Sequence, residues 1–189
     1  MEKKYSASEW ENLKPKLSAG ISAGDISRIV VLAQQDEALK QSLYDLILGE
    51  DERAGYHAAW VFTHFSREDF RWLYDKQDRL IGEVMLCRHG GKRRALLNIL
   101  YRQPLDKIRR VDFLDFCLER MLSAEELPGV QSLCMKIAYE LCLPIPELTH
   151  ELKTTLEMIE GDLCPAIRTV RRNILKAMQR GKSLQKQAF

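Results

Sequence analysis

The sequence predicts an all-α protein, an α-α superhelix of about four to five stacked helical hairpins. Two observations carry this prediction: a self-similarity that recurs every 37 to 39 residues, and an apolar pattern of helical period along most of the chain. The repeat is anchored at Ala54, Arg93, Val130 and Ile167. Three and seven positions further on stand residues that share one helix face: His57, Leu96, Leu133 and Val170, then Val61, Leu100, Ile137 and Ile174. The repeat therefore describes one buried helical stripe that is used several times.

Composition favours an ordinary globular chain. With 189 residues, 46% hydrophobic and 30% charged, the chain can bury a substantial core, and we expect one domain over residues 1–180 and a basic, flexible tail over 181–189. No apolar run approaches the roughly 20 residues that cross a bilayer, and the first ten residues lack a secretion segment. We therefore expect a cytoplasmic protein without a membrane contact. Five cysteines without a CxxC pair predict buried thiols rather than disulfides or a zinc site.

The N-terminal quarter reads as short helices. Ser6-x-x-Glu9 is a capping-box pattern that predicts a first helix ending near residue 17. A second helix is expected to begin near Asp25. The apolar positions between residues 26 and 48 permit one long helix or two short ones, and any break is expected within 34–37.

The middle of the chain predicts two helical hairpins. The first pairs a helix over 52–65 with a second helix that Ser66 caps, and Gly90-Gly91 closes the pair. The link at Ser66 is so short that the two helices must run antiparallel. The next hairpin pairs residues 92–101 with 104–122.

The last third repeats the design. Ser123-x-x-Glu126 reads as another capping box before a helix over 130–141. Pro144 and Pro146 stand where a helix can start without losing a hydrogen bond. The final helix, from Pro165 to about residue 180, has no partner and is expected to be a terminal half-repeat.

Two segments, 92–100 and 164–172, resemble the first helix of HEAT-like or armadillo-type repeats, in which an arginine precedes small and aliphatic residues. The resemblance covers roughly residues 52–180. It implies a superhelix that presents a curved surface to a macromolecular partner. The chain departs from the HEAT pattern because it lacks a regular ladder of aspartate and basic residues between paired helices.

Charge is concentrated at one end. Residues 163–189 hold seven basic and no acidic residues, whereas the remainder holds 22 basic and 27 acidic residues. On the last helix Arg168, Arg172 and Lys176 follow one another at four-residue spacing and form a basic ridge. Such a ridge either faces solvent or binds phosphates or an acidic protein surface. Further cations stand at Lys92, Arg93, Arg94, Arg109 and Arg110.

No catalytic pattern stands out. His57 and His64 stand seven positions apart on one helix, about 10 Å along its axis, which is too far apart for both to hold one metal ion, and His57 occupies the buried stripe. Nucleotide-binding, serine-hydrolase and zinc-protease motifs are absent from the sequence. We expect no catalytic residue, no metal and no cofactor.

The favoured interpretation is a non-enzymatic scaffold that binds another protein. Its expected surface is the row of second helices with Arg71, Trp72, Asp75, Arg109 and Arg110, because arginine and tryptophan are enriched in interfaces. The basic ridge is the second candidate. The alternative is a DNA-binding protein or an alkylpurine DNA glycosylase of AlkD-like fold. The resemblance implies this alternative because such glycosylases are also built from HEAT-like repeats. In that case Arg71, Trp72 and Asp75 would face the DNA.

Overall fold

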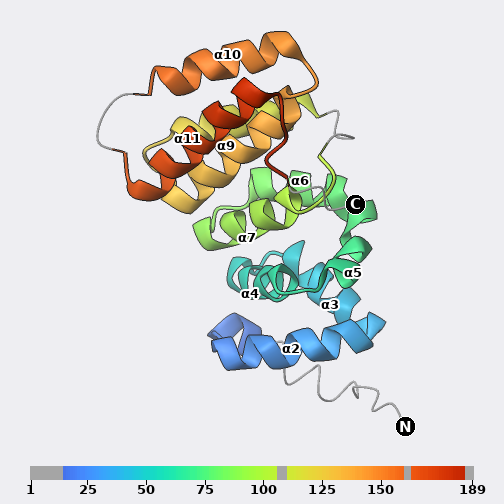
Figure 1. The fold of residues 1–189 in the computed structure, drawn as a ribbon. Coiled ribbons are helices and arrows are strands. Elements are labelled where there is room, and N and C mark those ends of the chain that lie inside the picture. The colour runs from blue at the N-terminus through green and yellow to red at the C-terminus, as the bar shows by residue number, and fades with distance from the viewer. Residues whose placement is uncertain (1–14, 106–109, 160–162, 186–189) are drawn as a thin grey trace. The chain divides into compact units, whose positions relative to one another are not determined.

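The computed structural model describes residues 15–105, 110–159 and 163–185, and every regular element in these ranges is a helix (Figure 1). This confirms the prediction of an all-α fold. The chain divides into two compact units, Met1–Ile99 and Leu100–Phe189, which we describe one at a time. The expectation of a single domain over 1–180 stays a prediction.

The first unit begins with helical residues 15–19 and continues with three helices that pack on one another: α2 (Ala23–Gln35), α3 (Glu37–Ile47) and α4 (Glu52–Thr63). The helical structure is interrupted at Asp36, between α2 and α3, within the expected range 34–37. The Asp36 backbone is extended, and its carboxylate accepts hydrogen bonds from the amides of Ala38 and Leu39 at 2.9 and 3.1 Å. Asp36 therefore ends one helix and caps the next.

The second half of this unit differs from the expected long helix after Ser66. Ser66 does cap a helix, but the segment divides into α5 (Arg67–Phe70), the 3₁₀ helix η1 (Arg71–Lys76) and α6 (Gln77–Leu86). The tighter 3₁₀ turns change which side chains share a face, and they aim Trp72 at α3 and α4.

Helix α7 spans Gly90–Tyr101, so Gly90-Gly91 opens a helix and does not close the preceding pair. The Glu52 carboxylate accepts hydrogen bonds from the amides of Arg88 and His89, and the His89 ring accepts one from the amide of Lys92. These contacts start the helix. A Cβ on Gly91 would lie 2.9 Å from the His89 ring and 3.2 Å from the Tyr56 ring, so a larger residue here would have to displace one of them.

The second unit is built around α9 (Pro128–Cys142), which packs against α8 (Val111–Leu122), α10 (Pro146–Glu157) and α11 (Pro165–Arg180). Each of α9, α10 and α11 begins with proline, a residue suited to a first turn because it lacks an amide hydrogen. The expected capping box at Ser123 is wrong. Ser123 ends α8, and Glu126 is buried in an ion pair with Arg120 at 3.3 Å.

The repeat frame agrees with the structure. Its four anchors fall on the third or fourth residue of α4, α7, α9 and α11, and the eight stripe residues that follow them are all buried. Four of the five cysteines are buried as expected, and Cys164 is half-buried. The Ser6-x-x-Glu9 pattern lies outside the described residues.

Candidate interaction surface

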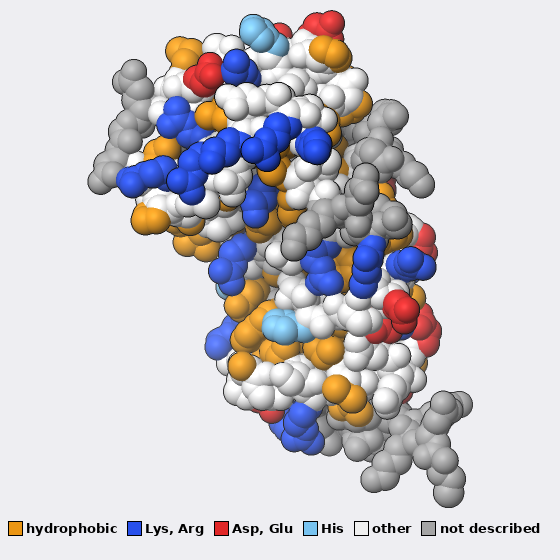
Figure 2. Space-filling view, in the orientation of Figure 1, with side chains coloured by type: hydrophobic (Ala, Val, Ile, Leu, Met, Phe, Trp, Pro, Cys, Tyr) orange, Lys and Arg blue, Asp and Glu red, His pale blue; other side chains and the backbone are white. Residues whose placement is uncertain are grey.

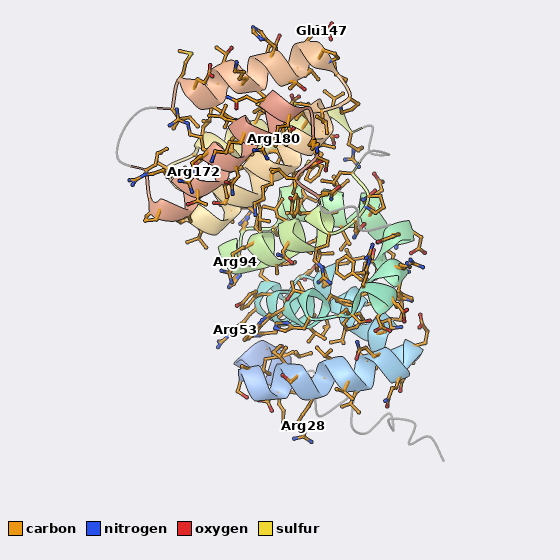
Figure 3. The ribbon with its side chains drawn as sticks, in the orientation of Figure 1. Arg28, Arg53, Arg94, Glu147, Arg172 and Arg180 are labelled. Carbon is orange, nitrogen blue, oxygen red and sulfur yellow. The ribbon has the colours of Figure 1, made fainter. Side chains whose placement is uncertain are left out.

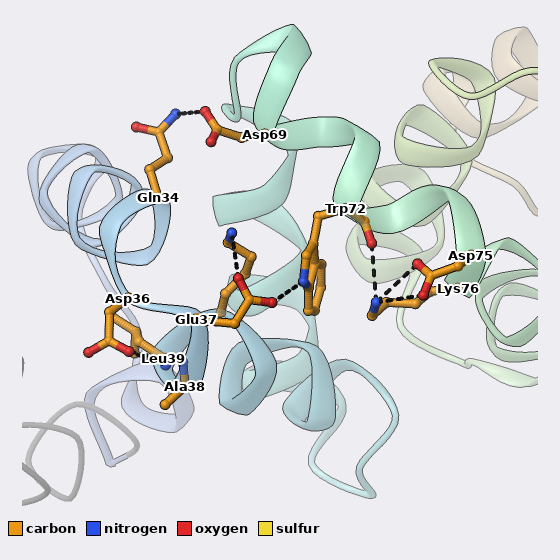
Figure 4. A network of polar contacts seen from close by, with 10 residues as sticks. Gln34, Asp36, Glu37, Ala38, Leu39, Asp69, Trp72, Asp75 and Lys76 are labelled. Carbon is orange, nitrogen blue, oxygen red and sulfur yellow. Dashed lines mark hydrogen bonds and ion pairs between the residues drawn. The ribbon is translucent and has the colours of Figure 1, made fainter.

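Trp72 is held by contacts inside the first unit (Figure 4). Its ring stacks on Phe62 with centroids 5.9 Å apart and meets Tyr44 edge-on at 5.8 Å. The indole nitrogen donates to the Glu37 carboxylate, and the Lys76 ammonium lies 3.7 Å from the ring centroid. The half-buried indole therefore joins η1 to α3 and α4, and its faces are largely occupied.

The other residues of the expected surface have different surroundings. Arg71 and Asp75 are exposed on η1, and Asp75 pairs with Lys76 at 3.0 Å. Arg110 belongs to the second unit and forms an ion pair with Asp112 at 2.6 Å; this hydrogen bond lowers the pKa of Asp112. Arg109 lies outside the described residues. Arg71, Trp72 and Asp75 thus share η1, with the indole turned towards α3 and α4, and their role in binding stays a prediction.

Lys92 is not a surface cation. Its side chain is fully buried, with the ammonium 2.5 Å from Glu83 and 3.8 Å from Glu52. A Cβ on Gly55 of α4 would lie 3.0 Å from the lysine side chain, so the missing side chain of this glycine makes room for it. Sequence reasoning missed this buried ion pair, because two partners stand 9 and 40 positions away along the chain.

The rings of His57 and His64 contact backbone carbonyl groups. His57 is buried, and its Nδ1 lies 2.6 Å from the carbonyl oxygen of Leu17. His64 contacts the carbonyl oxygen of Trp60 at 2.9 Å. Across residues 15–105, 110–159 and 163–185, no group of three or more His, Cys, Asp or Glu side chains is arranged to hold a metal ion.

Helix α11 carries more basic residues than any other described helix, and it carries no acidic residue. Its apolar side, Ile167, Val170, Ile174 and Ala177, is buried, and the helix packs on α9 and α10. Its opposite side is exposed and holds the basic ridge of Arg168, Arg172 and Lys176, which Arg180 extends by one more four-residue step. In Figure 2 an almost continuous run of lysine and arginine side chains follows α11, and Figure 3 labels Arg172 and Arg180 on it.

The cations of this row differ in their partners within the described residues. Arg168 donates to the carbonyl oxygen of Leu163 at 2.9 Å. Arg172, Lys176 and Arg180 form no ion pair with any carboxylate among the residues that the structure describes. Exposed carboxylates stand instead on the neighbouring helix α10, at Glu147, Glu151 and Glu157. The ridge is therefore a narrow cationic strip beside an acidic helix.

The chain after α11 is held in place by one buried carboxylate. Gly181 has a positive φ of 57° and ends the helix, with the Lys182 amide bonded to the carbonyl oxygen of Ala177. Glu140 of α9, only 6% exposed, then accepts hydrogen bonds from the Ser183 hydroxyl at 2.6 Å and from the amides of Leu184 and Gln185 at 2.7 and 3.1 Å. We call residues 182–185 the C-terminal strap.

Three further hydrogen bonds fasten the strap at its two ends. The Tyr139 hydroxyl donates to the carbonyl oxygen of Lys182 at 2.7 Å. The Gln185 side chain donates to the carbonyl oxygens of Tyr101 and Gln103 at 2.5 and 2.9 Å. Burial raises the pKa of Tyr101 to about 12. The first residues of the expected flexible tail thus make specific contacts, while residues 186–189 lie outside the described part of the chain.

Comparison with known families agrees with this architecture. A family model of the HEAT repeat domain matches residues 13–178, most of the chain. The chain belongs to the HEAT repeat domain family. The HEAT repeat assignment confirms the resemblance seen in segments 92–100 and 164–172, and it supports a helical-repeat fold. No curated protein and no solved structure matches the chain significantly. Within the described residues, the HEAT repeat helices include none with the length and apolar content to span a bilayer.

Proposed function

We propose that this HEAT repeat protein is a non-enzymatic scaffold that binds another protein, and that the basic ridge of α11 receives an acidic surface of that partner. The exposed cationic face of α11 carries the proposal. Exposed cations raise the association rate with an acidic surface and make binding sensitive to salt.

The terminal position of α11 supplies a simpler explanation for part of this pattern. A helical array needs a polar outer face on its last helix to remain soluble. Mixed charges would satisfy that need equally well, yet residues 163–189 contain seven basic and no acidic side chains. The uniform sign is what favours binding over simple capping.

Of the two expected surfaces, the basic ridge is a better candidate for partner binding than the surface around Trp72. The Trp72 ring already contacts Phe62, Tyr44 and Lys76, so little of it is open to a partner. Arg172, Lys176 and Arg180 are exposed and form no ion pair among the described residues. A partner gains more from cations that are not already neutralised.

The test is affinity capture with charge-reversed variants. The double variant Arg172→Glu with Lys176→Glu is compared with Arg28→Glu and Arg67→Glu, which changes the net charge equally at exposed positions of α2 and α5. We expect a discrete acidic protein that binds the wild type and the control and loses about tenfold or more in affinity for the ridge variant. Its binding should weaken between about 50 and 200 mM salt.

The same variants test the alternative function. Retention of duplex DNA by the wild type, lost on ridge reversal and without any protein partner, would replace the scaffold by a DNA-binding protein. Release of a methylated base from DNA, abolished by Asp75→Asn, would establish the glycosylase. A protein partner that binds the ridge variant as well as the wild type would refute the role of α11.

A further inference from the structure

The spacing of the basic ridge limits the shape of what can lie along it. Four residues of an α-helix rise about 6 Å, and a row of side chains at four-residue spacing is inclined by about 26° to the helix axis. At the bases of the side chains, successive ridge positions are therefore about 6.7 Å apart along the row, and each step turns about 40° around the helix. Four positions from Arg168 to Arg180 span three such steps.

An extended polypeptide has the same period. A β-strand rises about 3.3 to 3.4 Å per residue, and every second side chain lies on the same side, so like-facing side chains are about 6.6 to 6.8 Å apart. An α-helical partner fits less well. Its own four-residue row is inclined as well, so aligning the two rows makes the helices cross at about 50° and limits contact to the crossing point.

Neutral polar side chains border the ridge. Thr169 and Asn173 are exposed, and each stands three positions before a ridge cation, Arg172 or Lys176, which makes them neighbours on the helix surface. Hydroxyl and amide groups can hydrogen-bond to the main chain of an extended peptide, while the ridge cations pair with its side chains. The α11 face thus offers contacts to both the backbone and the charges of an extended acidic chain.

We propose that the ridge binds an extended segment of a partner protein with aspartate or glutamate at alternate positions. This inference rests on the proposed function and adds to it the conformation and the charge spacing of the bound segment. It predicts selectivity for charge spacing, which a diffuse electrostatic attraction does not give.

The surroundings of the ridge favour a peptide over a nucleic acid. Binding of single strands depends on aromatic side chains on which the bases stack, and the exposed side of α11 has none. A duplex distributes phosphates around a wide cylinder, with one charge about every 1.7 Å of axis, and would bring many of them towards Glu147, Glu151 and Glu157 of α10. A single extended chain is narrow enough to stay on the strip.

The experiment compares two labelled peptides of equal length, composition and charge by fluorescence anisotropy at low salt. One is Glu-Ser-Glu-Ser-Glu-Ser-Glu, and the other places four glutamates before three serines. We expect the alternating peptide to bind about fivefold or more tightly, because the clustered charges cannot reach all ridge positions. Arg172→Glu with Lys176→Glu should abolish the difference, whereas the control with Arg28→Glu and Arg67→Glu should keep it.

Other outcomes separate this inference from the proposed function. Equal affinity for both peptides, lost on ridge reversal, overturns the extended segment and leaves the scaffold standing. Absence of binding to either peptide also overturns it. A short oligothymidylate with four phosphates that binds more tightly than both peptides assigns the ridge to nucleic acid and overturns the proposed partner class as well. Circular dichroism of each variant checks that its total helix content is unchanged.

Discussion

Replacing Glu140 by glutamine keeps the shape of the side chain but removes the charge that holds the C-terminal strap. Three donors, the Ser183 hydroxyl and the amides of Leu184 and Gln185, converge on this carboxylate. A hydrogen bond to a charged group contributes about 1.5 to 3 kcal/mol, and a neutral one about 0.5 to 1.5 kcal/mol. Because the strap is partly exposed and its bonds are not additive, we expect a loss of about 2 kcal/mol in local stability.

Amide hydrogen exchange measures this loss directly, since two of the three donors are backbone amides. A change of about 2 kcal/mol corresponds to a fall of about 30-fold in the protection of Leu184 and Gln185. The amide of Ile137, in the middle of α9, should keep its protection because it exchanges with the whole unit. Glu125→Gln, at an exposed position, is the matched control. Unchanged protection of Leu184 and Gln185 in the Glu140→Gln variant would show that the carboxylate does not hold the strap.

Three other predictions test the packing and the thiols. Gly55→Ala should destabilise the protein by about 1 to 3 kcal/mol in urea unfolding, because its Cβ would press on Lys92 and on the Leu46 carbonyl oxygen. The control Gly82→Ala places its Cβ in open space and should stabilise the protein by about 0.5 to 1 kcal/mol. Equal effects of the two substitutions would contradict the tight contact at Lys92. Burial raises the pKa of Cys87 and of Cys142 from 9.0 to about 11, so the stability that these neutral thiols contribute should fall as pH rises from about 9 through about 11. At pH 8, iodoacetamide should modify Cys164 first, as followed by mass spectrometry, and rapid labelling of Cys87 would refute its burial.

Local signals in the sequence predicted the helices well where one residue type decides the outcome. The window 34–37 contains Asp36, whose short side chain can accept bonds from the amides that follow, and the break lies there. The final helix has the expected bounds because Pro165 can only begin it and Gly181 readily ends it. The buried stripe, including His57, followed from helical periodicity alone.

Local sequence signals failed where a side chain forms an ion pair that exists only in the folded structure. Ser123 and Glu126 have capping-box spacing, but Arg120 takes up the Glu126 carboxylate. The sequence placed Lys92 among the further cations, but in the structure it pairs with Glu83 and Glu52. Nothing in the local sequence marks either pairing.

The candidate surface shows the same division. The basic ridge is a property of one helix, so its spacing could be read before the fold was known. The strap depends on hydrogen bonds between residues 43 to 84 positions apart, and no periodic pattern in the sequence predicts such bonds. The contacts of Trp72 depend on the 3₁₀ geometry of η1, which the apolar spacing did not distinguish from an ordinary α-helix.

The contacts of Glu140 bear on where a recombinant version of the protein should stop. The family match ends at residue 178, and trimming the gene there is the usual choice. A chain cut at that point would lose the Gly181 turn and would leave Tyr139 and Glu140 facing water with their hydrogen bonds unmade. Versions intended for crystallisation or binding assays should therefore extend at least through Gln185.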